Sequence, residues 1–266
     1  MVRDPAVAGQ FYPGTKEDLA RDLKKMIPDI PDKIDAIGAV TPHAGYIYSG
    51  AVAGEVYARL KPKQAYIILN PNHTGYGAQF ALSPEAWRTP LGEVEIDKEL
   101  AAALKKKTSL IKEDATAHAF EHSGEVQVPF IQETSPGAKI VPITCYHGDL
   151  SELTEVADAI ASAISETGKD AIIIASSDMT HFESRKSAKA KDQKAIDRIL
   201  ELDAEGLLRT VSRENISMCG YIPTSIMLMA AKKLGAKKAK LVRYSDSGDA
   251  TGDTFQVVGY AGIIVY

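Results

Sequence analysis

Short apolar runs alternate along the chain with longer segments in which apolar residues recur every three or four positions. The short runs are typical of buried strands, and the longer segments are typical of amphipathic helices. The strands predicted in this way cover residues 36–41, 65–69, 139–144, 171–176, 238–244 and 256–266. The predicted helices cover residues 15–26, 49–60, 97–106, 151–166, 187–200, 204–213 and 222–234.

This alternation predicts the fold class. Strands that alternate with helices form a sheet of mostly parallel strands with helices on both faces. No long linker divides the chain, so we expect a single α/β domain over residues 1–266, with a mostly parallel or mixed central sheet. Two segments depart from the alternation. Residues 79–88 and 93–96 indicate an antiparallel excursion, and residues 245–253, rich in Gly, Asp and Ser, indicate a mobile loop.

Composition excludes several classes of function. The chain has 266 residues, of which 45% are hydrophobic, enough for one large core. Its net charge of -4 and the lack of a dense basic stripe argue against nucleic-acid binding. No apolar run approaches the roughly 20 residues of a membrane span, so we expect no membrane association. The two cysteines, Cys145 and Cys219, are too few for a disulfide scaffold and favour a reduced, cytoplasmic protein.

Four of the six histidines follow closely after predicted strands. They are His43, His73, His147 and His181. Parallel strands bring their carboxyl ends to one edge of a sheet, where ligands bind in open α/β folds. Neutral imidazole is the commonest metal ligand, and it is also a general base near neutral pH. The pattern therefore predicts a histidine-based site at this edge. Of the four histidines, His147 is the one for which the position at a strand end is the weakest indication of a role in that site.

The segments around His43 and His73 share one pattern, an apolar strand that breaks at a proline before the histidine. Taken alone, each histidine could lie in a turn and form only local hydrogen bonds. Together, on adjacent strands, they could supply two ligands to one metal. A third protein ligand with open positions beside it would make the site reactive rather than purely structural.

Asp178 and His181 lie three residues apart, a spacing that could place both on one face of a turn. A carboxylate beside an imidazole fixes its tautomer and raises its basicity. We therefore expect His181 to act as a general base or a ligand, oriented by Asp178. The alternative is that Asp178 only caps the following turn.

Residues 118–125 and the second cysteine supply further candidates. His118 and His122 lie four residues apart, without the residue order of the zinc proteases. We expect His122 to contact substrate or support a metal ligand, and His118 to lie at the solvated edge. Cys219, between two predicted helices, could complete a metal set as a thiolate. The alternative, a small buried hydrophobe, fits Cys145 better.

Six short motifs together resemble the Memo-like family, whose prokaryotic members are called AmmeMemoRadiSam system protein B. The resemblance spans nearly the whole chain, and the combination of motifs is far more specific than any one of them. The motifs lie at residues 8–13, 42–46, 72–73, 121–125, 176–181 and 218–220.

The resemblance implies a fold like the catalytic subunit of class III extradiol ring-cleaving dioxygenases. In those enzymes two histidines and a glutamate bind non-haem Fe²⁺, and another histidine acts as base. The resemblance implies that His43 and His73 occupy the positions of the two histidine ligands. It implies that His181 occupies the position of the base, with His122 beside it, and that Cys219 replaces the glutamate ligand. A thiolate makes the ligand set softer and is itself oxidisable.

We therefore expect a dioxygenase-like oxidoreductase that binds iron or copper, ahead of zinc, through His43, His73 and Cys219. His181, Asp178 and His122 would be its catalytic residues. The alternative is a non-catalytic module that binds a metal or a peptide in the same pocket. In both cases the expected ligand is a small molecule or a peptide, and the family name implies an AMMECR-like protein and a radical-SAM protein as partners.

Overall fold

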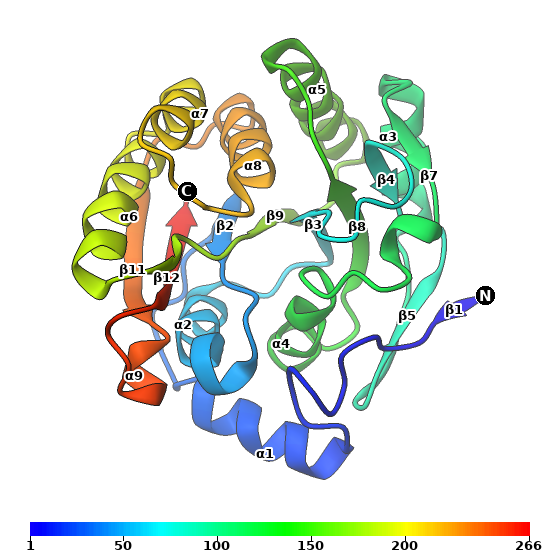
Figure 1. The fold of residues 1–266 in the computed structure, drawn as a ribbon. Coiled ribbons are helices and arrows are strands. Elements are labelled where there is room, and N and C mark those ends of the chain that lie inside the picture. Colours follow the sequence, from blue (N-terminus) through cyan, green and yellow to red (C-terminus); the bar gives the residue numbers. More distant parts are fainter.

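A mixed sheet of nine strands forms the centre of the computed structural model, which describes residues 1–266 (Figure 1). Its four middle strands run parallel to one another. In spatial order they are β2 (Gly38–Thr41), β9 (Ala171–Ser176), β3 (Ala65–Pro71) and β8 (Lys139–Cys145). Almost every residue of these strands is buried, which explains why they appear in the sequence as continuous apolar runs.

Antiparallel pairing occurs on both sides of the parallel centre. Next to β2 lies β12 (Val257–Val265), which also pairs with β11 (Ala239–Asp246) and β10 (His181–Glu183). Next to β8 lies β4 (Phe80–Leu82), followed by β7 (Ile111–Glu113). A separate small sheet contains β1 (Val2–Arg3), β5 (Ala86–Thr89) and β6 (Gly92–Val94).

Helices cover both faces of the sheet (Figure 1). One face carries α1 (Lys16–Met26), α2 (Tyr46–Arg59) and α4 (Val128–Thr134). The other carries α3 (Lys98–Lys107), α5 (Leu150–Thr167), α7 (Ala204–Arg213) and α8 (Tyr221–Lys233). Beside α7, α6 (Arg185–Leu200) packs against β11 and β12. One cluster of 67 buried apolar residues extends from Val7 to Val265, so the chain forms a single α/β domain.

The predicted elements agree with the structure apart from small differences at their ends. Thr15 and Asp97 cap α1 and α3, because their side chains accept hydrogen bonds from the backbone N–H of Asp18 and Leu100. None of the helices combines the length and hydropathy that crossing a bilayer requires.

Two predicted segments differ in detail. The antiparallel excursion is divided, because β4 joins the main sheet while β5 and β6 pair in the small one. The expected loop at 245–253 includes the end of β11 and the short helix α9 (Gly248–Thr251). This segment is tied to α6, since Arg185 bonds the carboxylates of Asp246 at 2.6 Å and Asp249 at 2.7 Å.

Candidate functional site

Three histidines meet at the carboxyl edge of the parallel strands. His43 follows β2, His73 follows β3, and His122 lies in the connection between two short 3₁₀ helices, Thr116–His118 and Glu125–Gln127. One ligand atom from each of the three imidazoles lies within 4.8 Å of the others. Two ligands of a tetrahedral ion bound at about 2.05 Å are about 3.4 Å apart, so small side-chain movements would close this cluster around one ion.

His43 is held in place by the end of β9. It is only 2% exposed, and its backbone N–H donates to Asp178 Oδ1 at 2.7 Å. Its ring Nδ1 lies 3.0 Å from Ser176 Oγ. Because β9 lies between β2 and β3, its carboxyl end is next to those of the two strands that lead to His43 and His73.

His73 is oriented by Glu121, a residue for which no role was predicted. Glu121 accepts hydrogen bonds from the backbone N–H of His73 at 2.6 Å and from its Nδ1 at 2.9 Å. Burial alone would raise the pKa of Glu121, but hydrogen bonds from His73 and Ser123 outweigh burial and lower this pKa to about 2. The ionised carboxylate therefore keeps the ring proton on Nδ1 and leaves His73 Nε2 free, as in many carboxylate–histidine–metal arrangements.

Cys219 reaches the site just before the first turn of α8. Its Sγ lies 3.2 Å from His43 Nε2 and accepts a hydrogen bond from the backbone N–H of Asp178 at 3.2 Å. Burial raises the pKa of this thiol, so without a metal the S–H is retained and can donate to His43 Nε2. Gly220 permits this approach, since a Cβ there would lie 2.3 Å from the carbonyl oxygen of Ser176.

Comparison with known proteins identifies the family. The model of the Memo-like protein family matches residues 3–264. The chain belongs to the Memo-like family. A MEMO1 family protein from Methanosarcina mazei is 47% identical over 99% of both chains. Another, from Methanopyrus kandleri, is 44% identical, again over 99% of both chains.

A solved structure shares the fold of this Memo-like chain. It is an uncharacterized protein from Escherichia coli K12, with a TM-score of 0.53 and 12% sequence identity. The match covers 84% of the Memo-like chain and 98% of the other chain. At this identity the likeness extends to the fold alone.

In this Memo-like protein His181 is held differently from our expectation. Its backbone N–H donates to Ser217 Oγ at 2.7 Å, and its Nδ1 lies 2.9 Å from the carbonyl oxygen of Ser217. A carbonyl only accepts, so His181 carries its proton on Nδ1 and leaves Nε2 free. The prediction that Asp178 orients His181 is therefore wrong, because that carboxylate bonds the backbone of His43 instead. Burial raises the pKa of Asp178 to about 6.

A cavity of about 490 Å³ opens beside the cluster, and most of the predicted site residues line it. Its polar lining includes His43, His73, His122, His181 and Asp178, and its apolar and aromatic lining includes Phe11, Tyr48, Val258 and Tyr260. Phe11 lies with its ring 4.7 Å from that of His122. No lysine or arginine lines this cavity. Cys219 contacts His43 but is not part of the cavity lining.

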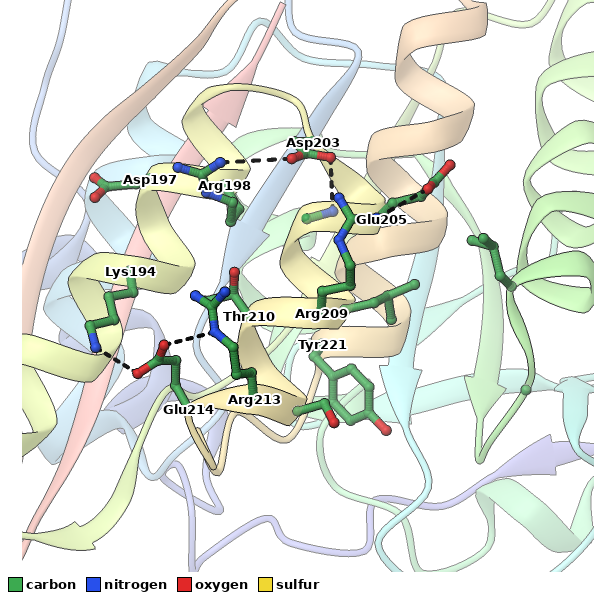
Figure 2. A pocket seen from close by; sticks show the side chains of 15 residues that line it. Lys194, Asp197, Arg198, Asp203, Glu205, Arg209, Thr210, Arg213, Glu214 and Tyr221 are labelled. Carbon is green, nitrogen blue, oxygen red and sulfur yellow. Dashed lines mark hydrogen bonds and ion pairs between the residues drawn. The ribbon is translucent and has the colours of Figure 1, made fainter.

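A larger groove of about 1220 Å³ lies between α6, α7 and the start of α5, away from the histidines (Figure 2). Its charges are largely paired with one another. Figure 2 shows both Lys194 and Arg213 reaching Glu214, at 2.6 and 3.0 Å. Arg209 likewise pairs with Glu205 at 3.3 Å. The groove holds no histidine or cysteine, so its size alone gives it no chemistry.

The remaining histidines and Cys145 lie outside the cluster. His147 is exposed. The expectation that His118 lies at a solvated edge is wrong, because it is 1% exposed, with Nε2 2.9 Å from the carbonyl oxygen of Ala81 and Nδ1 3.1 Å from Thr144 Oγ1. Burial lowers the pKa of His118 to about 4, so it is a neutral structural residue. Cys145 is a buried hydrophobe, as predicted.

Proposed function

We propose that this Memo-like protein is a metal-dependent oxidoreductase of the dioxygenase-like type. The main support is the group of three imidazoles whose ligand atoms lie within 4.8 Å of one another at the sheet edge. Clusters of nitrogen and sulfur donors with a cavity beside them are typical of reactive metal sites.

We assign two members of this group, His43 and His73, as protein ligands, and we assign Cys219, which lies outside the group but approaches His43, as the third. The 3.2 Å between Cys219 Sγ and His43 Nε2 is close to the roughly 3.5 Å expected for sulfur and nitrogen bound to one tetrahedral ion. His122, which packs between His73 and Phe11 and lines the cavity, would then support the ligands and contact the substrate. Thiolate with imidazole suits copper, and the resemblance to extradiol dioxygenases favours iron; either ion would supply electron transfer between O₂ and the substrate.

His181 is the proton acceptor in this proposal. Its free Nε2 belongs to a partly exposed ring that lines the cavity, and the Ser217 carbonyl holds the other nitrogen. Asp178, also in the lining, holds the His43 loop and could take a second proton near neutral pH. His122 and the aromatic walls would position the substrate. An aromatic cavity without lysine or arginine suits a small, largely uncharged molecule.

A second candidate is a non-catalytic module that binds a metal or a peptide in the same cavity. The exposed apolar side chains beside the cavity favour it, since Tyr48 is 41% exposed and Phe182, next to His181, is 71% exposed. Such side chains at the mouth of a pocket are suited to peptide contact. An AMMECR-like or radical-SAM protein would be the first partner to test in a pull-down experiment.

Metal analysis of protein purified without oxygen or chelators tests the ligand assignment. We expect about one iron or copper per chain, lost in the variants His43→Ala, His73→Ala and Cys219→Ala. His147→Ala, which removes an exposed histidine outside the cluster, is the control. Unchanged metal content in all three ligand variants would refute the assignment. A separate assay tests the second candidate. If incubation with catechols and O₂ gives coloured ring-cleavage products, the non-catalytic module is excluded.

A further inference from the structure

A chain of buried hydrogen bonds leads from the core to His43. Gln127 is fully buried and forms four hydrogen bonds. Its amide faces the carbonyl oxygen of Pro42 at 2.9 Å and Ser176 Oγ at 2.8 Å on one side. On the other side it faces the hydroxyls of Thr41 at 2.9 Å and Tyr57 at 3.1 Å.

The Pro42 carbonyl fixes the orientation of this amide. A carbonyl oxygen only accepts, so the group that faces Pro42 is the NH₂ of Gln127. The second N–H of that NH₂ then donates to Ser176 Oγ. The amide oxygen faces Thr41 and Tyr57, whose hydroxyls donate to it, and every hydrogen-bonding position of the Gln127 side chain is used.

The three neighbours of Ser176 Oγ determine where its single proton lies. They are the Gln127 NH₂, the carbonyl oxygen of Ser123 at 2.7 Å and His43 Nδ1 at 3.0 Å. The carbonyl of Ser123 can only accept, so it receives the proton of Ser176. The two lone pairs of Ser176 then accept from Gln127 and from His43, and His43 must carry its proton on Nδ1.

We propose that Ser176, held by Gln127, is a positioning residue that sets the tautomer of His43. With the proton on Nδ1, His43 Nε2 carries the free lone pair that a metal ligand requires, on the side of the ring that faces Cys219 Sγ. The opposite tautomer would leave the buried Ser123 carbonyl without a donor, which is costly in the interior. The consequence for metal affinity rests on the proposed function, whereas the tautomer of the metal-free protein does not.

Long-range ¹H–¹⁵N NMR of the metal-free protein tests the tautomer directly. We expect His43 in the wild type to carry its proton on Nδ1. Ser176→Ala removes the only acceptor at Nδ1 and should give a mixture of tautomers, while Ser176→Thr, which keeps the hydroxyl, should restore the wild-type spectrum. The matched control is Ser225→Ala, which removes another fully buried hydroxyl bonded to a backbone carbonyl, 2.8 Å from the oxygen of Tyr221.

Titration with Zn²⁺ alone, as a redox-inert probe, tests the consequence. Ser176→Ala should raise the Kd by about 10- to 100-fold, the usual effect of losing a group that orients a ligand, while Ser225→Ala should stay close to wild type. The proposal would be overturned if wild-type His43 carried its proton on Nε2. It would also be overturned if Ser176→Ala and Ser225→Ala gave the same tautomer spectrum and the same Kd for Zn²⁺. If the wild type binds no metal at all, the proposed function fails. The NMR measurement of the His43 tautomer in the metal-free protein still tests whether Ser176 is a positioning residue. The wild-type spectrum alone can refute the assignment if Ser176→Ala does not fold.

Discussion

Arg3→Met should destabilise the protein strongly, although Arg3 is the third residue of the chain and lies in the small sheet rather than in the main one. The Arg3 guanidinium is buried and bonds Glu125 Oε2 at 2.7 Å, with side-chain exposures of 5% and 1%. It also donates to the carbonyl oxygens of His118 at 2.7 Å and Glu121 at 2.8 Å. Its centre lies 4.4 Å from the ring of Trp87. These contacts fasten the N-terminal segment to the segment that positions His122.

The cost can be estimated from the groups left behind. Removing one partner of a buried ion pair costs about 3–5 kcal/mol. Glu125 keeps three other donors, the backbone N–H groups of Ala6 and Val7 and the hydroxyl of Tyr12, so the lower end of that range applies to the pair. The two carbonyls that lose a donor add about 1 kcal/mol each. We therefore expect Arg3→Met to lower the free energy of unfolding by about 5 kcal/mol.

Urea denaturation followed by circular dichroism measures this loss. Arg88→Met is the matched control, because Arg88 also pairs with two carboxylates, Asp4 and Glu93, but at the surface. Exposed pairs contribute about 0–1 kcal/mol, so the control should remain near wild type. A double-mutant cycle with Glu125→Gln then gives the coupling energy of the buried pair. If Arg3→Met costs no more than Arg88→Met, the buried contacts do not stabilise the fold as argued here.

Two further predictions concern the site. The pKa of Glu121 falls from 4.5 to about 2 on folding, so its contribution of about 3 kcal/mol is complete above pH 4.5 and disappears as the pH falls towards 2. The stability of Glu121→Gln should therefore fall less than that of the wild type as the pH is lowered from 4.5 to 2. Identical acid-unfolding profiles for the two proteins would contradict the lowered pKa of Glu121. Gly220→Ala should cost about 1–3 kcal/mol and weaken Zn²⁺ binding, because its Cβ would force α8 away from β9. Normal stability and normal affinity in this variant would show that the start of α8 adapts freely.

The parallel strands and two of the site histidines were predictable from the sequence because their signals are local. Strands buried on both faces leave apolar runs, and parallel pairing then brings the residues that follow them to one edge. His43 and His73 needed only this rule. Asp178 and His181 both line the cavity, but their spacing did not predict their contacts. The chain turns here into β10 and Phe182 adopts a φ of 57°, and Ser217 rather than Asp178 holds His181.

The roles of Glu121 and Phe11 beside His73 and His122 were beyond sequence reasoning, because distant contacts determine where these residues lie. Residues 114–127 contain only two short 3₁₀ turns, so no periodic pattern indicates which side chains face inward. Arg3 and Glu125, 122 positions apart, hold the two segments together, and this same pairing brings the ring of Phe11 against His122. Glu121 is therefore buried beside His73 as a result of an ion pair with no local signal. A carboxylate directly before a candidate histidine is the one sequence feature that could have suggested its role.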